Sequence, residues 1–137
     1  MRITQTLVNE ISYKIIGCAI EVHKHLGPGL LESVYHRCML EELRFTGLST
    51  KSQVPVPIKY KGIDIDAPLR LDILVEDLVI VELKAVEVMH PVYTAQGLTY
   101  LKLTGKAKTL VINFFTDNIS KSVVPLVGLT FAKLPVD

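Results

Sequence analysis

The sequence predicts a single-domain α/β fold in which a mixed central β-sheet is flanked by helices. Two segments with apolar residues at helical spacing come first, and short segments follow in which apolar and polar residues alternate. A third helical segment then precedes a nearly continuous apolar strand. The order α-α-β-β-β-β-α-β with a tail is typical of a sheet that carries helices on both faces. The length of 137 residues predicts one domain over residues 1–137.

The two N-terminal segments predict long amphipathic helices. In the first, apolar residues recur at helical spacing between Leu7 and Leu26, so we expect a helix that begins near Thr4 or Thr6. It ends before the loop Gly27-Pro28-Gly29. The second helix follows this loop and closes at Gly47, because glycine readily adopts the left-handed conformation that ends helices.

The central part of the chain predicts strands. From Gln53 the pattern has a period of two but contains prolines, which predicts an edge strand or an irregular extension of one. A turn at Lys61-Gly62 precedes a short strand over Ile63–Ile65. Two further strands, Arg70–Val75 and Val79–Lys84, are joined by a tight connection.

The C-terminal part predicts one more helix and the end of the sheet. Pro91 is suited to open a helix and Gly105 to end it. We expect a central strand over Thr109–Phe115 and a weaker strand over Val123–Phe131.

Composition predicts a cytoplasmic protein with no membrane partner. No apolar run approaches the roughly 20 residues of a membrane span, and the N-terminus has no apolar core of a secretion signal. Cys18 and Cys38 lie within apolar helical patterns, which favours two buried thiols over a disulfide.

The formal net charge of +1 argues against strong steering of nucleic acid by the whole chain, but the charges are unevenly distributed. Residues 62–87 carry seven acidic and two basic side chains. Residues 88–136 carry one acidic side chain and a basic flank: Lys102, Lys106, Lys108, Lys121 and Lys133. This order suits a metal site beside a phosphate-binding surface. Chance clustering on a solvated surface explains it equally well.

The two central strands carry the residues with the clearest chemistry. Alternate residues of a strand face the same side, so Glu82 and Lys84 share a face and Leu83 points the other way. A tight connection brings Asp72 beside Glu82, where two carboxylates repel unless a proton or cation lies between them. Oxygen ligands of this kind suit Mg²⁺ or Mn²⁺. Spacing alone also allows a buried ion pair of these acids with Lys84 or Arg70.

The face that Asp72 occupies depends on the register of this hairpin. Asp72 faces the side of Glu82 only if opposing residues have an even sum, as in Leu74 opposite Ile80. A two-residue connection gives an odd sum and turns Asp72 away. We therefore predict a three-residue connection over residues 76–78, or a bulge with the same effect.

Asp72 followed by Glu82-x-Lys84 on consecutive strands, after a helix that bears a glutamate, resembles the PD-(D/E)XK nuclease superfamily. The segment Gly29-Leu30-Leu31-Glu32-Ser33-Val34-Tyr35 matches the signature of one branch, the GxxExxY proteins. Further matches are Val22-His23, Leu26 to Gly29, Glu42-Leu43, Gly47, Gln96 and Tyr100-Leu101. The resemblance covers residues 7–115 and implies a restriction-endonuclease-like core.

The resemblance also implies a metal-dependent nuclease that acts on DNA or RNA with Mg²⁺ or Mn²⁺. The implied metal ligands are Asp72, Glu82 and the carbonyl of Leu83. The implied catalytic side chains are Lys84, Glu32 and Gln96. The proline of the superfamily's name is replaced by Leu71, a common departure.

Two side chains of the resemblance have a second interpretation. Tyr35 lies three residues after Glu32 on the same helical face, so it is either a core tyrosine or a donor that positions Glu32. Gln96 is a polar residue among apolar neighbours, so it is either a buried amide of the site or an exposed side chain.

Other classes of function remain open at this point. A non-catalytic module that binds nucleic acid or protein could retain the fold, and a homodimer could cover the apolar surplus. Small size and near-neutral charge favour these alternatives. The intact set Asp72, Glu82 and Lys84 favours the enzyme, because a binding module gains little from keeping all three.

Overall fold

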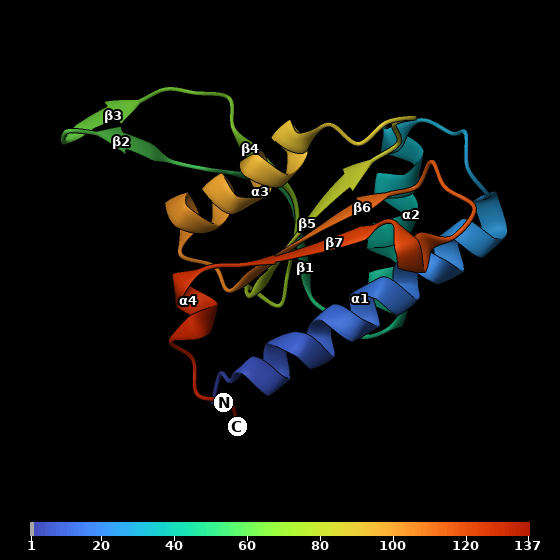
Figure 1. Ribbon diagram of the computed structural model, residues 1–137, viewed down its shortest axis with the longest axis horizontal. Helices are drawn as coiled ribbons and strands as arrows, with labels where there is room; N and C mark the ends of the chain where they lie inside the picture. The colour runs from blue at the N-terminus through green and yellow to red at the C-terminus, as the bar shows by residue number, and fades with distance from the viewer. Residues whose placement is uncertain (1) are drawn as a thin grey trace.

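The computed structural model describes residues 2–137 and has a five-stranded mixed sheet between two layers of helices (Figure 1). The strand order is β1-β4-β5-β6-β7, and β5 and β6 are the parallel pair. A second, two-stranded sheet pairs β2 with β3. The elements are α1 (Gln5–Leu26), α2 (Glu32–Phe45), β1 (Thr50–Pro55), β2 (Ile58–Tyr60), β3 (Ile63–Ile65), β4 (Arg70–Val75), β5 (Val79–Lys84), α3 (Pro91–Thr104), β6 (Lys108–Asn113), η1 (Ile119–Lys121), β7 (Val123–Val127) and α4 (Leu129–Ala132).

The helix ends confirm the predicted capping residues. The Thr4 hydroxyl accepts a hydrogen bond from the Leu7 N–H at 3.0 Å and caps α1. Gly47 has a φ of 85° just beyond α2, and Gly105 has a φ of 69° at the end of α3. Both glycines occupy the left-handed region in which other residues are strained.

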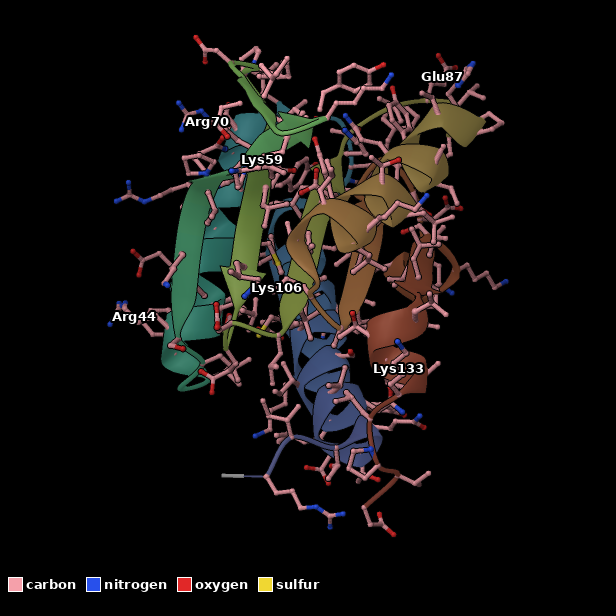
Figure 2. The ribbon with its side chains drawn as sticks, turned by 90° about the vertical axis from the view of Figure 1, so that its left-hand side faces the viewer. Arg44, Lys59, Arg70, Glu87, Lys106 and Lys133 are labelled. Carbon is pink, nitrogen blue, oxygen red and sulfur yellow. The ribbon has the colours of Figure 1, made fainter. Side chains whose placement is uncertain are left out.

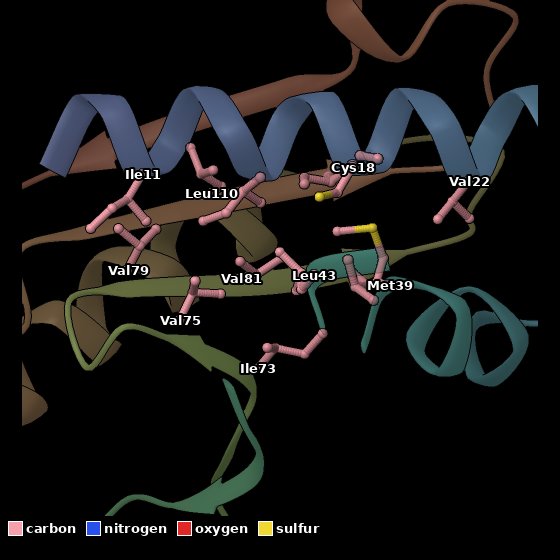
Figure 3. Packing of buried hydrophobic residues seen from close by; sticks show 14 of the residues in the cluster. Ile11, Cys18, Val22, Met39, Leu43, Ile73, Val75, Val79, Val81 and Leu110 are labelled. Atoms are coloured by element: carbon pink, nitrogen blue, oxygen red, sulfur yellow. The ribbon is translucent and has the colours of Figure 1, made fainter. Parts of the chain in front are cut away.

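Two apolar clusters hold the helices against opposite faces of the sheet. The larger cluster packs α1 and α2 against the sheet, and Figure 3 shows part of it: Ile11, Cys18, Val22, Met39, Leu43, Ile73, Val75, Val79, Val81 and Leu110. The smaller cluster lies under α3 and contains Val56, Leu71, Leu74, Ile80, Tyr100 and Leu101. Odd-numbered residues of β5 enter the larger cluster and Ile80 enters the smaller one, so Glu82 and Lys84 belong to the α3 face, as the alternation predicted.

The β4–β5 hairpin has the predicted register. Leu74 lies opposite Ile80 and Val75 opposite Val79, so three residues connect the strands. Glu76 and Asp77 both have positive φ, at 52° and 59°, which is costly for residues other than glycine. Side-chain contacts hold the turn: Glu76 accepts two hydrogen bonds from Ser49, and Asp77 forms an ion pair with Lys106 at 3.0 Å.

The alternation of side chains breaks at one position in β1 and β4. Ile73 packs on the α1–α2 face but Leu71, two residues earlier, packs on the α3 face. In the register of the two strands, Gln53 falls opposite Asp72, and Gln53 has a φ of 54°. The left-handed residue turns the following side chains to the other face, and Asp72 lies at the turning point.

Some predicted boundaries are wrong. β1 already begins at Thr50, and the chain leaves the main sheet after Pro55 because two nearby prolines cannot donate to a ladder. β6 spans Lys108–Asn113 rather than Thr109–Phe115. The weak last strand ends at Val127, and Phe131 belongs to the short helix α4 instead.

Within residues 2–137, no helix combines the length and the hydropathy that crossing a bilayer requires. Both cysteines are free thiols; Cys18 is buried, whereas Cys38 is only half-buried.

Candidate functional site

Asp72 and Glu82 meet where β4 and β5 move apart. The last ladder pair is Ile73 opposite Val81, and beyond it side chains replace the main-chain partners. The Asp72 N–H donates to Glu82 Oε2 at 2.9 Å, and the Leu83 N–H donates to Asp72 Oδ2 at 2.8 Å. Each carboxylate is thus held by the main chain of the opposite strand, and the two acids face each other across the gap.

The environment of Glu82 disfavours its charge. The side chain is 5% exposed, and burial followed by the nearby Asp72 carboxylate raises the pKa of Glu82 to about 8. The Asp72 N–H and the Lys84 ammonium act in the opposite direction but are weaker. A divalent cation between the carboxylates would relieve this repulsion.

The carbonyl of Leu83 points into the same gap. The Phe114 N–H donates to the Lys84 carbonyl at 2.8 Å, so that carbonyl is directed toward β6. Successive carbonyls of a strand point in opposite directions, so the Leu83 carbonyl is directed toward β4 and Asp72. The Leu83 carbonyl is therefore directed toward the strand that carries Asp72, on the side where the Leu83 N–H already donates to Asp72 Oδ2.

This donor set fits a hard divalent cation that keeps part of its water shell. Across residues 2–137, no group of three or more His, Cys, Asp or Glu side chains is arranged to hold a metal. The oxygen donors of Asp72 and Glu82 suit Mg²⁺ or Mn²⁺ better than zinc, which is usually held by nitrogen and sulfur ligands.

Lys84 is free of carboxylate partners. In the described part of the chain, no ion pair joins Lys84 or Arg70 to an acid. The Lys84 Nζ instead lies 4.5 Å from the ring centroid of Tyr93. The buried ion pair that spacing alone allowed is therefore not what the structure contains.

Glu32 faces the carboxylates from the first turn of α2. Partial desolvation raises the pKa of Glu32, Lys84 lowers it and Asp72 raises it further. Glu32 and Asp72 share an open groove of about 580 Å³ between α2 and the β1 edge. Its other lining residues are Ser33, His36, Arg37, Leu40 and Gln53.

Gln96 is exposed on α3, and the structure adds two tyrosines beside it. Tyr100 is 4% exposed; burial, then Glu82 and Asp72, raise its pKa, and hydrogen bonding by Gln96 lowers it. Tyr93, Gln96 and Tyr100 follow each other at i, i+3 and i+7, so they share one face of the helix. Sequence reasoning singled out only Gln96 as a site residue, although this spacing was available to find the two tyrosines.

Tyr35 does not position Glu32, so that interpretation is wrong. The Tyr35 side chain is fully buried and its ring stacks on Phe114 at 4.4 Å. Its hydroxyl donates to the Gly27 carbonyl and accepts from the Leu30 N–H. Tyr35 therefore holds the loop that leads into α2.

Two lysines of the basic flank, Lys106 and Lys108, lie at the end of the sheet far from Lys84. Lys108 is paired with Val79 at the start of β5, about 16 Å along the strand from Lys84 at a rise of about 3.3 Å per residue. Lys106 is bound to Asp77 in the hairpin turn, and Figure 2 shows it well apart from Arg70 and Glu87. The acidic site and these lysines therefore do not form one surface.

Comparison with known proteins gives one match. The family described as the PD-(D/E)XK nuclease superfamily matches residues 9–124, which include all the candidate site residues. No curated protein and no solved structure matches the chain. The five-stranded mixed sheet flanked by helices is consistent with the restriction-endonuclease-like fold. The chain therefore belongs to the PD-(D/E)XK nuclease superfamily.

Proposed function

We propose that this protein is a nuclease that uses Mg²⁺ or Mn²⁺ to hydrolyse phosphodiester bonds in DNA or RNA. One observation carries the proposal: the Asp72 and Glu82 carboxylates are each held by the main chain of the opposite strand, and Lys84, two residues after Glu82 on β5, forms no ion pair with either acid. An arrangement kept only for stability would pair the Lys84 ammonium with Glu82 or Asp72, because Glu82 is buried and a buried charge without a partner is costly.

In this proposal Asp72, Glu82 and the Leu83 carbonyl hold the metal ion. The ion, when bound, supplies a Lewis acid and lowers the pKa of a water molecule. The Lys84 ammonium orients the attacking water and offsets charge on the scissile phosphate. The Glu32 carboxylate accepts from a water at the mouth of the groove, and the exposed Gln96 amide donates to the substrate.

Finer assignments belong to the same proposal. The Gly29 to Tyr35 segment supports membership of the GxxExxY branch, because its glutamate faces the site and its tyrosine holds the loop before α2. We further propose that residues 1–137 act as one nuclease-like domain in the cytoplasm, which the two free thiols support.

A cleavage assay tests the proposal directly. The full chain, incubated with Mg²⁺ or Mn²⁺, is expected to cut at least one substrate in a panel of single- and double-stranded DNA and RNA. EDTA should stop the reaction. Absence of cleavage on every substrate, together with no Mn²⁺ binding by calorimetry, would contradict the nuclease.

The groove beside the site predicts where the substrate backbone lies. Arg37 lines the groove with Glu32 and Asp72 and has no ion-pair partner among residues 2–137. Arg37→Ala should weaken binding alike for all sequences and reduce the slope of log K against log salt by about 0.7–0.9. Fluorescence anisotropy with Ca²⁺ in place of Mg²⁺ measures binding without turnover.

The matched controls for Arg37→Ala are Lys102→Ala and Lys106→Ala. Both lysines border a hollow at the C-terminal end of α3, away from the groove that Arg37 lines. The salt slope should therefore stay unchanged in both variants. A reduced slope in these variants with a normal slope in Arg37→Ala would place the backbone on the basic flank instead.

The second candidate is a binding module or homodimer that retains the fold. The β2–β3 hairpin favours it, because its apolar side chains are exposed: 59% for Tyr60 and 61% for Ile63. Figure 1 shows this hairpin extending away from the main sheet. A dimer in sedimentation, combined with nucleic-acid or protein binding but no cleavage, would favour this candidate over the nuclease.

A further inference from the structure

The ammonium of Lys84 is held by an aromatic ring rather than by an acid. Its Nζ lies 4.5 Å from the centroid of the Tyr93 ring, within the range of a cation–π contact. The Lys84 charge is close enough to Glu82 to lower its pKa. In the described part of the chain, neither Glu82 nor Asp72 forms an ion pair with Lys84.

The start of α3 determines the position of the Tyr93 ring. Pro91 occupies the first turn, and the His90 side chain caps the helix by accepting the Val92 N–H at 3.0 Å. The Tyr93 N–H donates to the His90 carbonyl at 3.0 Å, and the two rings pack edge to face with centroids 6.5 Å apart. Tyr93 is thus fixed by its own main chain and by a neighbouring ring.

The contact has a consequence for the proposed reaction. A lysine side chain is flexible, and an ammonium beside two carboxylates is strongly drawn to them. An ion pair with Glu82 or Asp72 would occupy carboxylate oxygens that the metal ion needs and would withdraw the ammonium from the substrate. The face of an aromatic ring attracts the ammonium without offering a proton acceptor of that kind.

We propose that Tyr93 is a positioning residue that holds the Lys84 ammonium apart from Asp72 and Glu82 and toward the scissile phosphate. The inference rests on the proposed nuclease activity and adds a residue that acts through Lys84. The contact is made by the face of the ring and not by the hydroxyl. Tyr93→Phe should therefore retain the positioning of Lys84, and Tyr93→Leu should lose it.

Two measurements on the full chain test the inference. In protein labelled with ¹³C at the lysine ε carbon, the Lys84 signal is identified by its loss in Lys84→Ala. Ring current should shift its protons upfield in the native protein and in Tyr93→Phe, and the shift should vanish in Tyr93→Leu. In the same variants, kcat should fall about tenfold in Tyr93→Leu with KM within twofold, and should recover in Tyr93→Phe.

Val92→Ala is the matched control, since Val92 lies in the same turn with its side chain 52% exposed. Its kcat and Lys84 shift should match the native values, and thermal melts of every variant confirm folding.

If Tyr93→Leu folds, loses the shift and keeps full activity, the inference is overturned while the nuclease stands. An equal loss of kcat in Tyr93→Phe and Tyr93→Leu also overturns it, because the hydroxyl would then be the active group. A native protein that neither cuts nor binds Mn²⁺ overturns the proposed function and the positioning role with it.

Discussion

Lys84→Ala is expected to lower cleavage by about a hundredfold to ten-thousandfold, which is the range lost when a positioned catalytic group is removed. Mn²⁺ binding should persist in the variant. The structure supports the separation of the two effects, because Lys84 has no ion pair with a candidate metal ligand among residues 2–137. Removing a positive charge beside the carboxylates should tighten Mn²⁺ binding. Calorimetry for the metal and a gel assay for cleavage measure the two quantities independently.

Asp72→Asn is the complementary variant and should abolish Mn²⁺ binding as well as cleavage. The amide that replaces the carboxylate retains an oxygen that can accept the Leu83 N–H, so the hairpin gap should stay intact. Thermal melts distinguish loss of a ligand from loss of the fold. Unfolding of Lys84→Ala, together with no divalent-ion binding by the native protein, would assign the cluster a structural role and contradict the enzyme.

The metal-free protein should become less stable as the pH rises from 4.5 toward 8. The pKa of Glu82 is about 8 in the folded chain and 4.5 as its ordinary value, so the folded state holds a proton that the unfolded state releases. In this window the free energy of unfolding falls by up to about 1.4 kcal/mol per pH unit. Below the window the group contributes no slope, because both states are protonated. Urea unfolding at several pH values, in EDTA, measures the effect.

Glu82→Gln isolates the contribution of Glu82 from that of the histidines and of Glu32. The variant should lack this part of the pH dependence and should be the more stable protein near pH 8. Saturating Mn²⁺ should remove the loss in the native protein and leave the variant unchanged, since the variant lacks a ligand. Identical slopes in native and variant proteins would mean that Glu82 is not buried against Asp72.

Helix ends were predictable because their causes are local. Thr4, Gly47 and Gly105 act through the hydrogen bonds and the dihedral angles of their own turns. The even register followed from requiring Asp72 and Glu82 on one side, and the three-residue connection satisfies it. The opposite faces of Glu82 and Leu83 needed only the period of a strand.

The exact placement of Asp72 was not predictable from that period. Regular alternation assumes that every residue keeps extended dihedral angles, but Gln53 in β1 is left-handed, and the alternation in the neighbouring β4 breaks at Asp72. The two acids then fill the gap with hydrogen bonds to the opposite main chain. Such a defect depends on two strands acting together, so neither strand's pattern reveals it.

The order of the three long helices and of the strands in the main sheet could be predicted from the sequence, as could the helix caps and the hairpin register. The resemblance added Asp72, Glu82, Lys84 and Glu32 as candidates. These properties arise within single elements or adjacent ones. The single irregular strand expected from Gln53 is instead split between β1 and β2, which lie in two different sheets. The surroundings of these candidates depend on how the chain packs: the Tyr93 ring lies beside the Lys84 ammonium, Arg37 lines the groove, and Lys106 lies at the far end of the sheet. Those neighbours come from separate parts of the chain, and the packing of α2 and α3 on opposite faces of the sheet determines which charges lie within reach of one another.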